Sequence, residues 1–385
     1  PLYNSQGTGT ITTSASTLSL KSNVKFEPGN NATFATYEPN GWGMVLHNDS
    51  ENSSETINLS LGTTGVDLII EPNTESLTSG FVNYYSPGKN WTLQTSPSTN
   101  HLTGVAYGNG TYVAVGNEGI IYTSSDGTSW NTVTSGTANT LQNLTFANDT
   151  FVTVGNSGTI LTSTDGISWT SRTSGSSDTL IGIIYGNNTF VTVGNSGTIL
   201  TSTDGISWTS KTSGTSSSLQ SITHGNGIFV AVGESGTILT SSNGTTWTSR
   251  TSGITNFLIG AAYGNDTYVT VGSSGIILTS PDGTTWTTRT SGTSIDLRGV
   301  SYGSNRFVTV GGTGTILTSN NGSSWTSRSS GTTQHFSRVT RGNNNFAAVG
   351  NSGTIATASD GIYDDDSHGI GVKSYGVDFT INGNL

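Results

Sequence analysis

One acidic or amide side chain recurs every 39 residues along most of the chain, each time directly before a glycine. These positions are Asp126, Asp165, Asp204, Asn243, Asp282, Asn321 and Asp360. A carboxylate can transfer protons or supply oxygen ligands to a metal ion. An amide cannot act as a general acid or base, yet it takes the same place in two copies. The series therefore predicts a structural role, in which the side-chain oxygen accepts backbone N–H groups and the glycine takes a positive φ.

Tryptophans follow the same period, at Trp91, Trp130, Trp169, Trp208, Trp247, Trp286 and Trp325. Each unit contains four short β-prone runs separated by Gly- and Asn-rich turns, for example 180–185, 190–194, 198–202 and 208–212. Four strands in about 40 residues are typical of a propeller blade. We expect an all-β fold with a seven-bladed β-propeller, in which each Trp packs between neighbouring blades.

The arithmetic of the repeat also predicts how the ring closes. An eighth tryptophan would fall at position 364, where the chain has Asp364. A Trp-led strand instead stands in front of the first unit, at 90–95, with no three strands before it. We expect this N-terminal strand to complete the last blade, which removes the open sheet edges of the ring.

Two motifs carry a resemblance to known families. The pattern Ser-x-Asp-Gly-x-x-Trp at 124–130, 163–169, 202–208 and 280–286 resembles the Asp-box of sialidase-type (BNR) repeats. The longer Val-Gly-x-x-Gly-Thr-Ile-Leu-Thr-Ser-x-Asp-Gly-x-x-Trp phrase resembles the propellers of the photosystem II assembly factor family. The resemblance covers about 90–363. It implies that the Asp-box turns join the third and fourth strands, on the face opposite the ligand site, and it implies no particular activity.

Differences between the nearly identical units point to the other face. They cluster just before the first strand of each unit and in the turn between the second and third strands. We predict that the ligand-binding residues are His101, Glu118, Asp178, Glu234, Phe257, Asp296, Gln334 and His335. The alternative is that these exposed loops have varied freely without any partner.

Basic residues fall into two sets. Arg172, Lys211, Arg250, Arg289 and Arg328 each follow a Trp by three residues, which places them on the outer strand as rim charges. Arg298, Arg338 and Arg341 have no Arg or Lys counterpart in the other units. A sialidase requires three converging arginines, a tyrosine–glutamate pair and an acid, but the repeats contain only Glu118 and Glu234 as glutamates. We therefore expect no catalytic residues and no enzymatic activity.

The flanking segments lack the period. Short alternating runs in residues 1–86 predict a small β-sandwich-like domain for attachment or assembly, followed by the propeller at 87–363. The tail 364–385 contains a strand at 377–381, which we expect to return to the N-terminal domain. Asp364, Asp365 and Asp366 could hold Ca²⁺, but they lack the Gly and Glu of a calcium loop, so we expect a solvated linker, no metal site and no cofactor.

Composition limits the partners. The formal net charge is −10, which disfavours nucleic acid and anionic membrane surfaces. No apolar run approaches 18 residues, so we expect no membrane insertion. The chain has no cysteine, and only 9% of its residues are charged.

Cysteine-free β proteins rich in Thr, Ser, Gly and Asn resemble the fibre, knob and decoration proteins of phage virions. This resemblance implies a non-enzymatic protein on the virion surface, attached to other virion proteins through residues 1–86. Its propeller face would meet a host glycan or protein receptor. The alternative is an extracellular adhesin or filament subunit at a bacterial or archaeal cell surface, and a lectin or assembly-factor module is a third possibility.

Overall fold

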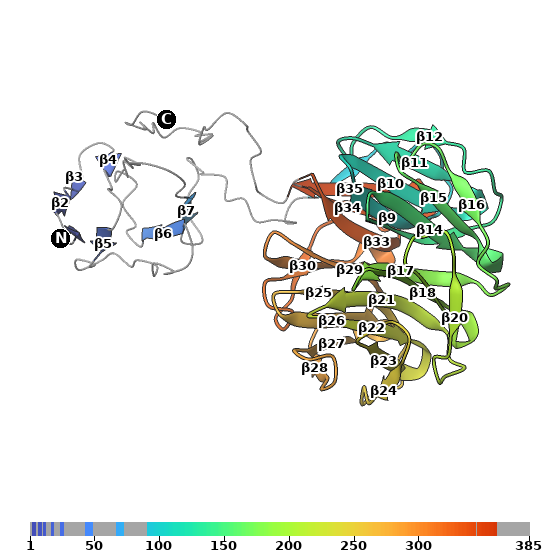
Figure 1. Cartoon of the computed structure of the whole chain (residues 1–385). Helices are drawn as coiled ribbons and strands as arrows, with labels where there is room; N and C mark the ends of the chain where they lie inside the picture. Colours follow the sequence, from blue (N-terminus) through green and yellow to red (C-terminus); the bar gives the residue numbers. More distant parts are fainter. Residues whose placement is uncertain are drawn as a thin grey trace. The chain divides into compact units, whose positions relative to one another are not determined.

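The computed structural model describes residues 91–343 and 345–359, together with the backbone of seven short strands between residues 2 and 72 (Figure 1). The chain divides into two compact units, one of residues 86–362 and one of residues 1–85 with 363–385. Within the described residues, no helix has the length and hydrophobicity that a membrane crossing requires.

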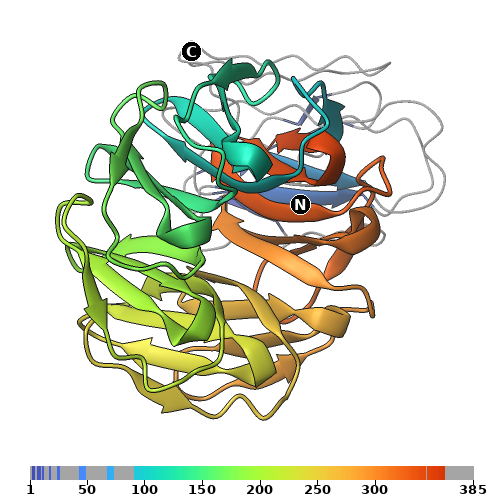
Figure 2. The same ribbon diagram turned by 90° about the vertical axis from the view of Figure 1, so that its right-hand side faces the viewer.

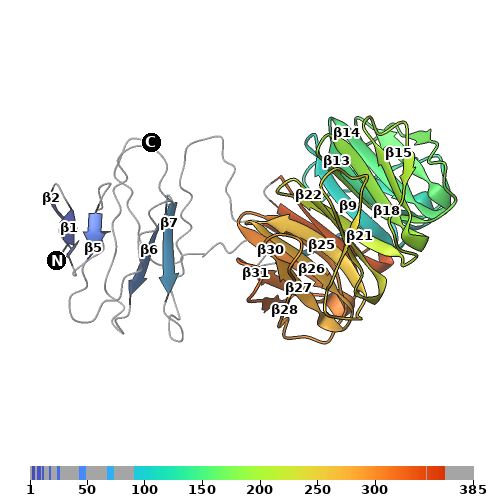
Figure 3. The ribbon, with the colours of Figure 1, turned by 60° about the horizontal axis from the view of Figure 1, so that its bottom comes forward.

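In the N-terminal unit, the described strands form three small sheets. They are β1 (Leu2–Asn4), β2 (Gly7–Gly9), β3 (Ile11–Thr12), β4 (Thr17–Leu18), β5 (Val24–Phe26), β6 (Gly43–Asn48) and β7 (Asp67–Pro72). The first sheet has the order β2-β1-β5, and β6 lies parallel to β7 (Figure 3). β3 pairs with β4 in a separate sheet. Most residues of the expected sandwich-like domain, and the strand expected at 377–381, lie outside the described residues, so both stay predictions.

The second unit is an all-β propeller of seven four-stranded antiparallel sheets around a common centre (Figure 2). The innermost strands are β9 (Leu102–Gly108), β13 (Leu141–Ala147), β17 (Leu180–Gly186), β21 (Leu219–Gly225), β25 (Leu258–Gly264), β29 (Leu297–Gly303) and β33 (Phe336–Gly342). The second strands are β10 (Thr111–Gly116), β14 (Thr150–Gly155), β18 (Thr189–Gly194), β22 (Ile228–Gly233), β26 (Thr267–Gly272), β30 (Arg306–Gly311) and β34 (Asn345–Gly350). We number the blades 1 to 7 in the order of these strands.

The third strands are β11 (Ile121–Ser124), β15 (Ile160–Ser163), β19 (Ile199–Ser202), β23 (Ile238–Ser241), β27 (Ile277–Ser280), β31 (Ile316–Ser319) and β35 (Ile355–Ser359). The outer strands are β12 (Asn131–Val133), β16 (Thr170–Arg172), β20 (Thr209–Lys211), β24 (Thr248–Arg250), β28 (Thr287–Arg289), β32 (Thr326–Arg328) and, for blade 7, β8 (Thr92–Gln94). Short 3₁₀ turns join the second and third strands: η1 (Asn117–Gly119), η2 (Asn156–Gly158), η3 (Asn195–Gly197), η4 (Glu234–Gly236), η5 (Ser273–Gly275), η6 (Gly312–Gly314) and η7 (Asn351–Gly353).

Strand β8 confirms the predicted closure, because it comes from the N-terminal side of blade 1 and forms the outer strand of blade 7. It pairs antiparallel with β35, with Leu93 opposite Ala356. Every described blade thus has four strands, and the ring is closed by backbone pairing between residues more than 250 positions apart.

Apolar side chains are packed between the blades rather than within them. At the junction of blades 1 and 2, Val113 and Val115 share a buried cluster with Leu141 and Phe151, and Trp169 packs against it. Equivalent clusters lie at the other six junctions. The tryptophans therefore contribute to the inter-blade core, as the sequence predicts.

Candidate functional site

The propeller has two faces with different loops. The loops that precede the inner strands share one face with the 3₁₀ turns, and backbone bonds join them, such as Asn117 N to His101 O at 3.0 Å. We call this the variable face. The hairpins between the first and second strands share the opposite face with the turns between the third and fourth strands, as Asn343 Nδ2 donating to Ser125 O at 3.3 Å shows. We call this the turn face.

On the turn face, the repeated carboxylate closes a tight turn. Oδ1 of Asp165 accepts the backbone N–H groups of Ile167 and Ser168, both at 2.8 Å. Gly166 has a φ of 74°, and the Trp169 indole donates to its carbonyl at 2.9 Å. Asn243 uses its side-chain oxygen in the same way, with two N–H bonds of 2.9 Å.

The N–H and hydroxyl groups that donate to these carboxylates also lower the pKa of each carboxylate. The bond from the backbone N–H of Ser168 contributes most to lowering the pKa of Asp165 to about 2, and the equivalent bond from Ser207 does so for Asp204. The pKa values of Asp126 and Asp282 are lowered further, chiefly by the Ser129 N–H and the Thr284 hydroxyl. Such groups stay ionised acceptors and cannot act as acids near neutral pH. Asn321 accepts the same two bonds, and Asp360 lies outside the described residues.

On the variable face, the four predicted acidic residues are held by local hydrogen bonds. The bonds are Asn100 Nδ2 to Glu118 Oε2 (3.2 Å), Thr198 Oγ1 to Asp178 Oδ2 (2.6 Å), Ser218 N to Glu234 Oε2 (3.4 Å) and Ser274 N to Asp296 Oδ1 (2.9 Å). Each carboxylate thus braces a loop or turn near its own blade. The structure distributes the four around the ring and does not gather them into one acidic site.

Phe257 and Gln334 are exposed at the same level of the ring. The Phe257 side chain is 46% exposed, although its backbone N–H is fixed by the Ser273 hydroxyl at 3.1 Å. Gln334 donates its backbone N–H to Thr332 Oγ1 at 3.0 Å, and its side chain is exposed. Both side chains are available for contact with a partner.

The two predicted histidines come together at the junction of blades 7 and 1. His101 precedes β9, and its Nε2 lies 2.8 Å from the Ser337 hydroxyl of β33. His335 directly precedes β33. Burial lowers the pKa of His101 most, and the positive charges of Arg298 and His335 lower it further. The two imidazoles are therefore close enough to repel each other when both are protonated.

Two arginines complete this cluster, and sequence reasoning did not count them among the binding residues. Arg338 lies on β33 and lines a central cavity of about 240 Å³ formed by the inner strands of all seven blades. Its Nη1 donates to the backbone carbonyls of Arg298 at 3.1 Å and Ser337 at 3.0 Å. Burial, followed by the charge of Arg298, lowers the pKa of Arg338 to about 10. We call His101, Arg298, His335 and Arg338 the cationic mouth.

A signal for these arginines was present in the sequence. The six residues equivalent to Arg298 are Thr103, Gln142, Ile181, Gln220, Ile259 and Ser337. The six residues equivalent to Arg338 are Gly104, Asn143, Gly182, Ser221, Gly260 and Gly299. A charge that appears once at a position that is otherwise small or neutral marks a departure from the scaffold.

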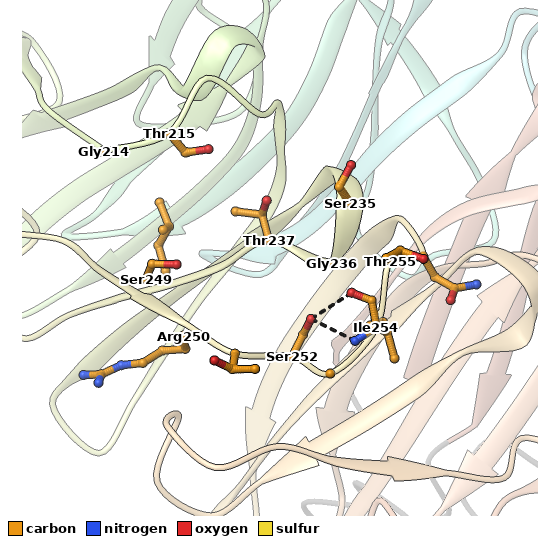
Figure 4. A pocket seen from close by; sticks show the side chains of 14 residues that line it. Gly214, Thr215, Ser235, Gly236, Thr237, Ser249, Arg250, Ser252, Ile254 and Thr255 are labelled. Carbon is orange, nitrogen blue, oxygen red and sulfur yellow. Dashed lines mark hydrogen bonds between the residues drawn. The ribbon is translucent and has the colours of Figure 1, made fainter.

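Surface grooves recur at equivalent places in three blades. One of about 740 Å³ lies along blade 4, where Ser249, Arg250 and Ser252 line it and Ser252 Oγ bonds to the backbone of Ile254 (Figure 4). Grooves of about 690 Å³ and 1060 Å³ lie at the equivalent places of blades 2 and 6. Recurrence at equivalent residues indicates a property of the architecture rather than one specific site.

Four arginines on the outer strands and two exposed isoleucines are further features of the propeller surface. Arg172, Arg250, Arg289 and Arg328 lie on outer strands as predicted, and each Nε donates to a Thr hydroxyl of the adjacent strand at 2.8–2.9 Å. The turn face is not uniform, because Ile167 and Ile206 are 62% and 49% exposed at a position that blades 1, 4, 5 and 6 fill with Thr or Ser. Within the described residues, no group of three or more His, Asp or Glu side chains is arranged to hold a metal ion.

Fold and ring closure define a seven-bladed β-propeller. No family model matches the chain, and no curated protein sequence does. Among solved structures, YCF48 bound to D1 peptide is 18% identical, with a TM-score of 0.60, over 74% of this chain and 99% of that chain. A catalytically inactive virginiamycin B lyase from Staphylococcus aureus with quinupristin is 14% identical, with a TM-score of 0.63, over 70% and 99%.

The WD40 propeller domain of Doa1 is 13% identical, with a TM-score of 0.58, over 72% of this chain and 98% of that one. At these identities the likeness shows a common propeller fold. It does not carry over an activity.

Proposed function

We propose that this protein is a non-catalytic recognition module that binds a protein or glycan partner through the variable face. The observation that carries the proposal is the cationic mouth, in which two single-occurrence arginines and two histidines of blades 6, 7 and 1 converge at one end of the inner strands. A scaffold that repeats its residues so closely has no need of this charge cluster for folding.

The placement of the glutamates favours binding over catalysis. Glu118 and Glu234 belong to blades 1 and 4, and each accepts a local hydrogen bond. A sialidase-type reaction needs a glutamate beside a tyrosine and opposite an acid, so this distribution disfavours it. We also propose that the repeated Asp turns are Asp-boxes, because the Asp165 and Asn243 bonds match a turn-forming role.

The solved propeller structures that resemble this chain include one with a bound peptide and one enzyme. The YCF48 structure contains a bound D1 peptide, which supports a peptide or protein as the class of partner. The neighbouring lyase is an enzyme, so turnover is the competing outcome.

For the biological setting, we propose display on a virion surface, with residues 1–86 attached to other virion proteins. The support is the composition, with 9% charged residues and no cysteine. The alternative is an adhesin or extracellular filament subunit of a bacterial or archaeal cell. Immunogold labelling separates them: labelled purified phage particles support display on a virion, and label confined to cell surfaces contradicts it.

Binding is tested with the full chain on glycan and peptide arrays, using two variants that copy residues of other blades. The first is the double variant Phe257→Thr with His335→Thr, which places on the variable face the threonine that blades 2 and 3 have there, Thr140 and Thr179. The second is Asp165→Asn on the turn face, which copies Asn243. We expect the first variant to lose the array signal and the second to keep it. Loss in the second variant alone contradicts the proposal, as does substrate turnover that Glu118→Gln or Asp178→Asn abolishes.

A further inference from the structure

No carboxylate is among the groups that shift the pKa of His101 or Arg338 at the cationic mouth. Arg298 and Arg338 are close enough to lower the Arg338 pKa, and His101 experiences both Arg298 and His335. The nearest acids along the chain are engaged elsewhere, since Asp296 accepts from Ser274 N and Glu118 from Asn100. Like charges held together in this way lower stability unless an anion offsets them.

The cationic mouth also contains a hydrogen-bond donor that has no acceptor among the described residues. Nε of Arg298 is buried and has no hydrogen-bond partner among the described residues. A buried donor without a partner lowers stability, so native proteins rarely keep one without a reason. Rim arginines such as Arg172 and Arg250 show the contrast, because each Nε donates to a threonine hydroxyl.

The geometry leaves room for a small ligand. Arg338 is fixed through Nη1 by two backbone carbonyls, and it is the one charged residue among the described residues that line the central cavity. Gly260 and Gly299, which are equivalent to Arg338 in blades 5 and 6, also line this cavity and fill little of it. A guanidinium held in place in this way can present its remaining donors to a planar or tetrahedral oxyanion.

We propose that the cationic mouth binds the oxyanion group of a ligand, a sulfate, phosphate or carboxylate, through the guanidinium groups of Arg298 and Arg338. His101 flanks the group and adds charge when protonated. The inference rests on the proposed function, for which it names the contact chemistry on the variable face. Burial, followed by the charges of Arg298 and His335, lowers the pKa of His101 in the free protein. A bound anion therefore raises the proton affinity of His101, and binding strengthens as the pH falls from 8 to 6.

The test is calorimetric titration of the full chain with sodium sulfate, whose charge is constant over this pH range. We expect binding at pH 6 that is at least about 5-fold tighter than at pH 8. Arg338→Ser and Arg298→Gln, which copy Ser221 and Gln142, should each weaken binding at least about 10-fold. Arg172→Gln removes one rim charge as the matched control and should change affinity less than 2-fold.

Equal weakening by Arg172→Gln and Arg338→Ser would show a general charge effect and overturn the proposal. No sulfate binding by the wild-type chain at pH 6 would also overturn it. Titration with N-acetylglucosamine-6-sulfate and with N-acetylglucosamine distinguishes a free ion from a sulfated sugar as the source of the group. If the arrays show binding through the variable face while sulfate does not bind, this inference alone fails and the proposed function stands.

Discussion

The Gln94 side-chain amide donates a hydrogen bond of 2.8 Å to the hydroxyl of Thr357, which joins residues 263 positions apart in the chain. The bond lies between β8 and β35, the strand pair that closes the ring. Because β8 completes the last blade and ties the two ends of the propeller together, this short strand stabilises blades that lie far from it in sequence.

The closing strand is tested by Leu93→Pro. Proline removes a backbone donor and fixes φ in the middle of β8, where Leu93 pairs with Ala356. We expect the free energy of unfolding to fall by about 2–3 kcal/mol in chemical denaturation. Leu93→Thr is the control and should have little effect, because the Leu93 side chain is 45% exposed. Equal stability of the two variants would show that β8 does not support the ring.

A second prediction concerns the contact between blades 7 and 1. A Cβ at Gly342 would lie 2.1 Å from the ring of Tyr107. Gly342→Ala should therefore destabilise the protein by about 1–3 kcal/mol. The Tyr107 Cβ would also lie 2.3 Å from the new Cβ. Adding Tyr107→Gly removes both the ring and this Cβ, so the double variant should lose less than the sum of the two single variants. Additive losses in a double-mutant cycle would contradict this contact.

The Asp turns predict a dependence of stability on acid. Asp165 and Asp204 have folded-state pKa values of about 2, below the unfolded value near 4. Their stabilisation is therefore complete above about pH 4 and is lost as the pH falls toward 2. Asp165→Asn with Asp204→Asn, which copies Asn243 and Asn321, should flatten the decrease of the thermal midpoint between pH 4 and 2. A midpoint that decreases as steeply as in the wild type would exclude these groups as the cause.

His224 predicts a second pH effect of the same direction at higher pH. Its ring packs on Phe229 with a centroid distance of 4.6 Å, and its buried Nε2 has no hydrogen-bond partner among the described residues. Burial lowers the His224 pKa, so the unfolded chain binds a proton more readily and stability falls as the pH decreases through about 6.5.

The measurement is the thermal midpoint of His224→Phe, which copies Phe146, compared with the wild type at pH 8 and pH 5. We expect a larger gain in stability at pH 5 than at pH 8. Tyr185→Phe in the neighbouring blade serves as a control without a titrating group in this range. A gain that is the same at both pH values would mean that packing alone explains the effect.

The repeat predicted the fold well because its information is local. Each 39-residue unit specifies four strands and one Asp turn, and the displaced strand at 90–95 specifies closure. The cationic mouth was harder to predict, since His101 and Arg338 are 237 positions apart and meet only when the ring closes. Variation between the units points to His101 and His335, which occupy one repeat position. It does not assign Arg298 and Arg338 to the cationic mouth, because strand periodicity does not show which side chains lie near the two histidines.

Two of the predicted carboxylates also make local hydrogen bonds. Asp178 and Glu234 are predicted to contact a ligand because they differ between blades, and this stays a prediction; each also accepts a local bond, from the Thr198 hydroxyl and from the Ser218 N–H. Loops of a single blade fold back on one another, so a short acidic side chain readily meets a hydroxyl or backbone donor nearby. A difference in sequence between blades therefore does not by itself distinguish an acidic residue that stabilises a loop from one that contacts a ligand.

The most direct test of the account is a variant in which the corresponding residues of blade 3 replace the four residues of the cationic mouth. Its thermal midpoint of unfolding is measured at pH 6 without added anion and compared with that of the wild type. This variant carries His101→Thr, Arg298→Ile, His335→Thr and Arg338→Gly. If the four residues serve binding, removing their mutual repulsion should leave the midpoint unchanged or raise it, and addition of sulfate should no longer raise it as in the wild type. A midpoint several degrees lower, with the sulfate effect retained, would show that the cluster serves folding and would contradict the account.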